Sequence, residues 1–213
     1  MTVTESAESK TKSKPKKARY VGTKPSTPTT RGVDHLALVT DDMAETMAFY
    51  TDVMGMQLLH VRRVPFAPNR GQPPHDNLRH YFFGMGNDSL LAFFEYPKGL
   101  DHSDRDLPGG MQHLAFHVPS DELDKMVEHV KSHDVDVVGP VSLGGRFWSA
   151  YFYDNNGIRL ELATSLAGAG VSNVGSILQT EEEAREELET LFDDPKDIER
   201  WLKAMPLVEE PLA

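Results

Sequence analysis

Four side chains in this sequence could bind a metal ion, because they recur as two matched pairs. The runs GVDHLALVT and GMQHLAFHV each place a histidine, His35 or His113, near the start of a strand-forming segment. Each run is followed later by a strand that ends in a glutamate, Glu95 in the first case and Glu161 in the second. Histidine nitrogens and carboxylate oxygens together suit Fe, Mn, Zn, Ni or Co. The repeat therefore predicts a metal site.

Strand alternation indicates which way these side chains point. Side chains alternate between the two faces of a strand, so His113 shares a face with Ala115 and His117, and His35 with Ala37. Glu161 alternates with leucines and should also point away from the aliphatic layer. A carboxylate turned into a sheet interior is costly unless it is paired or bound to a metal. We expect Glu95 to lie analogously if its strand is regular to its end.

The elements that would hold these residues form two β-α-β-β-β modules. The fold class predicted is α+β, with the modules forming a curved mixed sheet around a metal site. In the first module, the expected elements are a helix from Asp42 and strands at 56–64, 78–85 and 88–96. In the second, they are a helix from Ser120 and strands at 135–138, 147–154 and 158–163. The proline-rich segment 65–77 is predicted to be a loop.

The modules predict a domain over residues 32–165, with module one at 32–97 and module two at 110–165. Residues 1–31 are rich in Lys, Ser, Thr and Pro, which predicts a flexible arm. Residues 166–213 are predicted to form a loop and helices, opened by a capping box at Thr180 and by Asp194-Pro195.

Composition narrows the class of partner. The formal net charge is −11, which argues against nucleic acid, because neutralising phosphates requires a basic face. No apolar run is long enough to span a membrane, so we expect a cytoplasmic protein. A metal held by the predicted ligands would keep coordination positions open, so we expect a small-molecule substrate. The chain has no cysteine, so a metal would be held by His, Asp and Glu alone. We expect a homo-oligomer, and the sequence leaves open whether the site forms within one chain or between two.

These residues resemble the vicinal oxygen chelate superfamily over about residues 32–165. The resemblance is carried by Asp34-His35-Leu36, by Gln112-His113-Leu114-Ala115-Phe116 and by the segment YFYDNNGIRLE, which ends at Glu161. The superfamily holds glyoxalase I, type I extradiol dioxygenases, fosfomycin-resistance enzymes and metal-free antibiotic-binding proteins. The resemblance implies the paired-module fold and the position of the metal.

Within the superfamily, the sequence looks most like the extradiol dioxygenases. That resemblance implies an Fe(II) site with His35, His113 and Glu161 as ligands, a catechol-type aromatic substrate and O2 as co-substrate. It also implies a substrate-binding role for Tyr151 and places His102 near the metal. The acid/base histidine of those enzymes has no counterpart here, so proton delivery would fall to His102 or His117.

Two other classes stay open. A glyoxalase-like lyase, isomerase or epimerase would use Glu95 as a fourth ligand, with Mn, Ni, Co or Zn as the metal. Two positions argue against glutathione-dependent glyoxalase I itself, because Val39 and Gly99 stand where that enzyme has an arginine and an asparagine. The third class is a small-molecule-binding resistance protein, which commonly lacks the ligands present here.

Overall fold

The computed structural model describes residues 19–26, 28–30, 32–64, 78–165 and 173–211. It divides into two units, Ser26–Thr164 and a second formed by Met1–Pro25 with Ser165–Ala213. The predicted loop 65–77 lies outside the described residues, as does the predicted arm up to residue 18. No helix within the described ranges is long and apolar enough to cross a membrane.

The first module of the larger unit follows the predicted order of elements. Its elements are β2 (His35–Thr40), α1 (Met43–Ala48), the π-helical turn η1 (Phe49–Val53), β3 (Leu58–Val64), β4 (Leu78–Gly86) and β5 (Ser89–Glu95). The strands form a sheet in the order β2-β5-β4-β3. β2 runs parallel to β5, because the helix carries the chain across, whereas β4 and β5 form a hairpin. Asp42 begins α1 as predicted, and its side chain accepts a hydrogen bond from the backbone of Glu45.

The second module repeats this order. It consists of β6 (Leu114–His117), α2 (Leu123–Lys131), β7 (Val138–Leu143), β8 (Phe147–Tyr153) and β9 (Arg159–Ser165), with the sheet order β6-β9-β8-β7. The strand expected at 135–138 was placed too early, because β7 begins at Val138. The chain turns at 132–134 after α2, where Asp134 has a left-handed backbone with a φ of 59°, and residues 135–137 then form neither helix nor strand.

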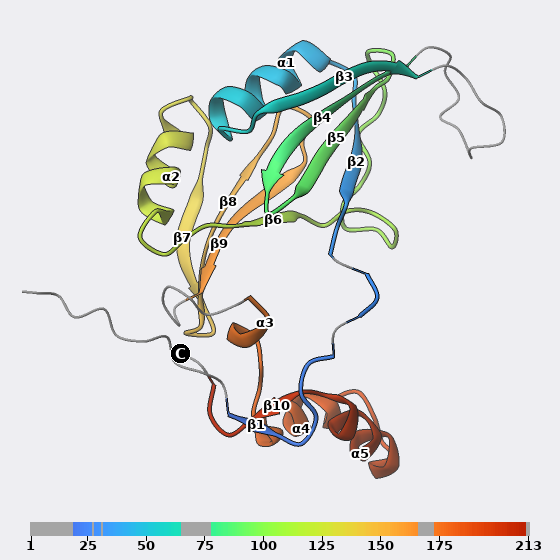
Figure 1. The fold of residues 1–213 in the computed structure, drawn as a ribbon, viewed down its shortest axis with the longest axis vertical. Coiled ribbons are helices and arrows are strands. Elements are labelled where there is room, and N and C mark those ends of the chain that lie inside the picture. Colours follow the sequence, from blue (N-terminus) through green and yellow to red (C-terminus); the bar gives the residue numbers. More distant parts are fainter. Residues whose placement is uncertain (1–18, 27, 31, 65–77, 166–172, 212–213) are drawn as a thin grey trace, which may run out of the picture. The chain divides into compact units, whose positions relative to one another are not determined.

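The α+β class and the two modules are confirmed, and their eight strands form two sheets of four (Figure 1). One apolar core joins both modules, and it includes Tyr50 from the first module and Val127 and Leu160 from the second. The hydroxyl of Tyr50 donates to Oδ2 of Asp154 at 2.8 Å across this core. Each sheet therefore turns one face to the shared core and one face away from it. We call the second the open face of that sheet.

The smaller unit is helical. Its elements are β1 (Tyr20–Val21), α3 (Asn173–Ser176), α4 (Glu181–Glu189), α5 (Pro195–Ala204) and β10 (Leu207–Val208). The capping box at Thr180 and the helix start at Asp194-Pro195 are both present as predicted. Part of the predicted arm is ordered, because Tyr20–Val21 pairs with β10. Ala184, Ile198 and Leu202 are among the residues of this unit's own core.

Candidate metal centre

The two histidines predicted as ligands are held in the same way. Nδ1 of His35 lies 2.6 Å from Oδ1 of Asp34, and Nδ1 of His113 makes a short hydrogen bond with Oε1 of Gln112. In both modules the preceding residue thus occupies one ring nitrogen and leaves Nε2 available. Metal-binding histidines characteristically use the other nitrogen in this way, because the bond fixes the ring and its tautomer. Sequence reasoning missed the roles of Asp34 and Gln112, although a polar acceptor directly before each histidine was a readable signal.

Glu161 lies beside His113 on the open face of the second sheet. Oε2 of Glu161 is 2.9 Å from Nε2 of His113, the nitrogen that Gln112 leaves available. The two residues meet because β6 and β9 are parallel neighbours, with Ala115 opposite Glu161. Only 6% of Glu161 is exposed. A buried carboxylate oxygen next to an imidazole nitrogen fits a divalent metal, so this donor set passes the chemical test for a metal site.

Tyr151, for which the resemblance implies a substrate-binding role, lies beside this pair. Its ring is 6.2 Å from that of His113, edge to face, and its hydroxyl interacts with Glu161. The guanidinium of Arg159 lies 4.3 Å from the centre of the Tyr151 ring. Burial and the neighbouring Glu161 carboxylate raise the pKa of Tyr151, which keeps its hydroxyl protonated near neutral pH.

His35 does not join this group within one chain. Among the described residues, no three His, Asp or Glu side chains lie close enough together to hold a metal ion. The reason lies in the packing of the modules, because both sheets turn their helix-covered faces to one core and their open faces away from it. One chain therefore holds the predicted ligands in two separate groups, which we call half-sites: His35 on the first sheet, and His113 with Glu161 on the second.

The structure also separates Glu95 from His35. Glu95 is opposite Thr40 across the β2–β5 pair, and Thr40 points into the covered side of the sheet, away from His35. Oε2 of Glu95 accepts a hydrogen bond from Arg79 at 3.1 Å. The position that matches Glu161 is Ala92. Ala92 pairs with Ala37, two residues after His35, and Glu161 pairs with Ala115, two residues after His113. The sequence analysis predicted Glu95 because it stands at the end of its strand, whereas the strand register matches Ala92 with Glu161.

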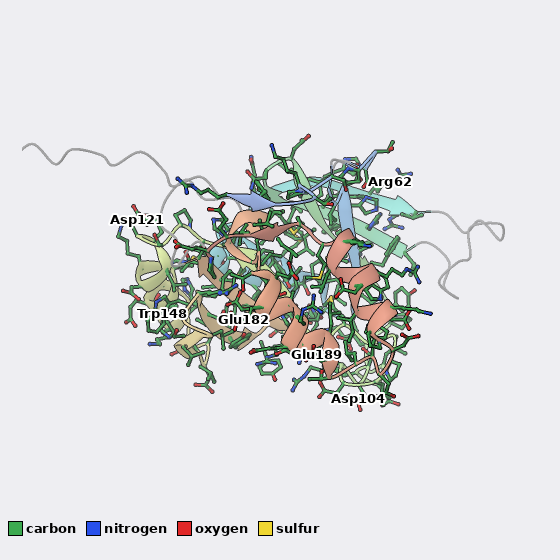
Figure 2. The ribbon with its side chains drawn as sticks, turned by 90° about the horizontal axis from the view of Figure 1, so that it is seen from below. Arg62, Asp104, Asp121, Trp148, Glu182 and Glu189 are labelled. Atoms are coloured by element: carbon green, nitrogen blue, oxygen red, sulfur yellow. The ribbon has the colours of Figure 1, made fainter. Side chains whose placement is uncertain are left out.

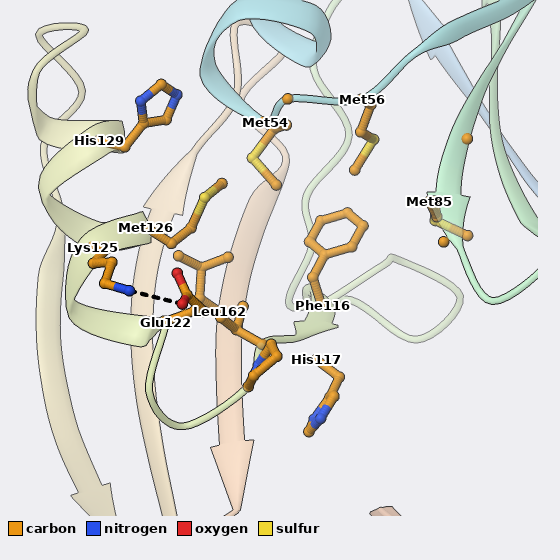
Figure 3. A pocket seen from close by; sticks show the side chains of 15 residues that line it. Met54, Met56, Met85, Phe116, His117, Glu122, Lys125, Met126, His129 and Leu162 are labelled. Carbon is orange, nitrogen blue, oxygen red and sulfur yellow. Dashed lines mark hydrogen bonds and ion pairs between the residues drawn. The ribbon is translucent and has the colours of Figure 1, made fainter. Parts of the chain in front are cut away.

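The two histidines predicted to deliver protons lie in different places. His102 packs on the turn between β8 and β9, where a Cβ added to Gly157 would come within 3.0 Å of its Nδ1. His117 is the last residue of β6, and strand alternation places it on the same face of the sheet as His113. His117 also lines a cavity of about 500 Å³, shown in Figure 3, with its ring turned away from the methionines there. That cavity is mainly apolar and includes Met54, Met56 and Met126.

The turn between β8 and β9 has a structural role that sequence reasoning missed. Oδ1 of Asp154 accepts from the backbone of Asn156 and of Ile158, at 2.9 and 2.8 Å. Asn155 donates to Oγ1 of Thr46 at 2.9 Å and so ties this turn to helix α1. These contacts hold the hairpin that carries Tyr151 and Glu161 at a fixed position against the first module.

Comparisons with known proteins agree with this architecture. The family model of the "Glyoxalase/Bleomycin resistance protein/Dioxygenase superfamily" matches residues 32–162. Over 134 residues the chain is 29% identical to "Uncharacterized protein YaeR" of Escherichia coli, a match that covers 61% of this chain and 93% of that protein. It is 28% identical over 131 residues to "Lactoylglutathione lyase GLX1" of Arabidopsis thaliana, covering 60% of this chain and 42% of the plant enzyme.

Among solved structures, the fold is similar to a glyoxylase/bleomycin resistance protein/dioxygenase domain from Frankia sp. EAN1pec. The TM-score is 0.54 and the sequence identity 22%. The match covers 64% of this chain and 99% of the Frankia chain. At this identity the similarity concerns the fold alone.

Proposed function

Because the chain belongs to the glyoxalase/bleomycin resistance protein/dioxygenase superfamily, we propose that it is a metal-dependent enzyme acting on a small molecule with two neighbouring oxygen atoms. The observation that carries this proposal is the donor set on the second sheet. Nε2 of His113 meets the buried carboxylate of Glu161, and Gln112 occupies the other ring nitrogen. His35 has the matching arrangement with Asp34 on the first sheet.

We assign the ligands as His35, His113 and Glu161, with His35 supplied by one chain and the other two by a second copy. Two observations support this assignment. The three side chains are not gathered within one chain, and both half-sites lie on faces turned away from the core. Most homo-oligomers are symmetric, so an interface that joins the first sheet of one copy to the second sheet of the other would form two equivalent sites. Glu95 is left out, because its strand register turns it to the covered face.

A divalent metal held there would polarise the two oxygens of the substrate and leave coordination positions open for it. The chain's own residues have the remaining tasks. Asp34 and Gln112 hold the two imidazoles in orientation. Tyr151 presents a protonated hydroxyl beside Glu161, where it can donate a hydrogen bond to a substrate oxygen.

For the reaction, our first candidate is extradiol ring cleavage of a catechol-type substrate by O2, with Fe(II). The set of two histidines and one carboxylate supports this candidate, because it is the ligand type of non-haem Fe(II) oxygenases. Proton delivery would then involve Tyr151, His102 or His117. Of these three residues, Tyr151 has the support of direct interactions with both His113 and Glu161.

The second candidate is a glyoxalase-like lyase or isomerase that uses Mn, Ni, Co or Zn. The 28% identity to a lactoylglutathione lyase supports it. Such a reaction moves a proton at the carbon next to the bound oxygens, so it requires a base but no O2.

Elemental analysis of protein purified without oxygen, followed by two assays, tests both candidates. We expect about one metal ion per chain, because the proposed pair of chains forms two equivalent sites. Iron with catechol-dependent oxygen uptake supports ring cleavage. Nickel, zinc, cobalt or manganese, with turnover of methylglyoxal and glutathione and no oxygen uptake, supports the lyase. Protein that binds none of these metals with measurable affinity would overturn the proposal and favour a metal-free binding protein.

A further inference from the structure

The open face of the first sheet is basic and aromatic around His35. The strand register assigns to it, besides His35 itself, the side chains of Ala37, Val39, His60, Arg62, His80, Phe82, Leu90, Ala92 and Phe94. None of these residues is acidic, although the whole chain has a formal net charge of −11. A face without carboxylates on so acidic a protein favours a negatively charged ligand.

Phe82 lies at the centre of this face, with three imidazoles around it. The ring centres of His35 and His60 are each 5.8 Å from that of Phe82, and the centre of His80 is 4.3 Å away. Arg62 is opposite His80 across the β3–β4 pair. Figure 2 shows Arg62 on β3, at the surface of the protein. His60 and His80 therefore share with the proposed metal ligand His35 a contact with the Phe82 ring, and Arg62 lies next to His80 on the neighbouring strand.

His80 is the member of this group whose hydrogen bonding is incomplete. Only 9% of the residue is exposed, and its ring stacks on Phe94 with centres 3.8 Å apart and planes 7° from parallel. Its Nε2 is buried and has no hydrogen-bond partner among the described residues. Buried polar groups are almost always paired, and leaving one unpaired is costly. A ligand oxygen bound at this face would supply the partner.

Arg62 contributes the permanent positive charge. Its side chain is exposed, and no carboxylate in the described part of the chain forms an ion pair with it. A guanidinium presents its N–H groups in a planar fork that fits two oxygens of one anion. Its neighbour Arg63 is opposite Arg79 and so belongs to the other face of the same strand. Arg62 therefore faces the proposed site and Arg63 does not, so Arg63 can serve as a control for Arg62.

We propose that Arg62, His60 and His80 bind a negatively charged oxygen group, a carboxylate or a phosphate, on the substrate. This inference rests on the proposed function, because it places the charged group beside the metal-bound oxygens of that same substrate. It narrows the substrate class to small oxyanions that also carry two neighbouring oxygen atoms. Phe82 and Phe94 would pack against the carbon skeleton that joins the two parts.

The test follows the imidazole NMR signals of His60 and His80 in metal-free protein during titration with sodium acetate or with inorganic phosphate, at constant ionic strength. We expect both signals to shift and to saturate in the wild-type protein. Arg62→Gln should raise the apparent dissociation constant at least about tenfold, the usual effect of losing a charge-assisted hydrogen bond. Arg63→Gln should change it by no more than about twofold, as expected for a surface charge on the far face.

The two probes identify the anion. Saturation by acetate alone supports a carboxylate, saturation by phosphate alone supports a phosphate, and saturation by both supports a general oxyanion site. The inference is overturned if neither anion shifts the two signals, or if both arginine variants weaken binding equally. Separate titrations with Fe(II), Mn(II), Ni(II), Co(II) and Zn(II) keep the two proposals apart. Anion binding without metal binding would overturn the proposed function alone, and the reverse result would overturn this inference alone.

Discussion

Nε2 of His113 lies 2.9 Å from Oε2 of Glu161, on a sheet face turned away from the core. The pair is held from both sides, because Gln112 bonds the other ring nitrogen of His113 and the hydroxyl of Tyr151 interacts with Glu161. This half-site is therefore already organised within one chain. What one chain does not bring to it is His35.

The two glutamates should respond differently to the same change. Glu161→Gln removes the charge of a proposed ligand, so metal affinity should fall by more than about a hundredfold, beyond the loss typical of residues that only support ligands. Glu95→Gln should retain wild-type metal content, because Glu95 bonds Arg79 on the covered face. Metal titration of both variants by calorimetry measures this, with circular dichroism as the control for folding. Equal losses in the two variants would restore Glu95 as a ligand.

Asp34 and Gln112 should tune metal affinity without binding the metal. Asp34→Leu or Gln112→Leu leaves Nδ1 of the adjacent histidine without its acceptor, so the ring loses its fixed tautomer and orientation. We expect each variant to bind metal about 10- to 100-fold more weakly. The same titration provides the measurement, and Asp34→Asn, which keeps an acceptor oxygen, should recover most of the affinity. An unchanged affinity in both leucine variants would remove these residues from the site.

The sequence predicted the modules because their signals are local. Histidines, capping residues and strand alternation repeat within short segments, and the structure confirms the order of elements that they indicate. Strand register is not a local property. Whether Ala92 or Glu95 corresponds to Glu161 depends on the pairing of β2 with β5, which the spacing along the chain does not specify. Likewise, the separation of His35 from His113 follows from the packing of two modules on one core, which no single motif encodes.

His80 should make the stability of the metal-free protein depend on pH. Burial, followed by the positive charges of His35, Arg62 and His60, lowers the pKa of His80 from 6.5 to about 4. Between these values the unfolded chain binds a proton that the folded chain does not, so stability is full above pH 6.5 and declines as the pH falls towards 4.

Urea unfolding at several pH values between 7.5 and 4.5 measures this dependence. His80→Phe keeps a ring to stack on Phe94 and has no titrating group, so its stability should decline less over this range than that of the wild-type protein. Identical slopes in the two proteins would contradict the assigned pKa of His80.

The shared site should be detectable by mixing two inactive variants. His35→Ala damages the half-site on the first sheet and Glu161→Ala damages the half-site on the second, so each variant alone should lose both metal and activity. In a dimer that joins the first sheet of one copy to the second sheet of the other, a mixed pair contains one site with both defects and one intact site.

Random reassociation of equal amounts makes half of the dimers mixed, and half of the sites in each mixed dimer are intact. The mixture should therefore recover about a quarter of the wild-type metal content and activity. Refolding the two chains together, followed by metal analysis and assay, makes the measurement, and refolding each variant alone is the control. A site formed within one chain predicts no recovery at all, because every chain in the mixture carries a defect. Recovery near a quarter would place His35 and Glu161 of one site on different chains.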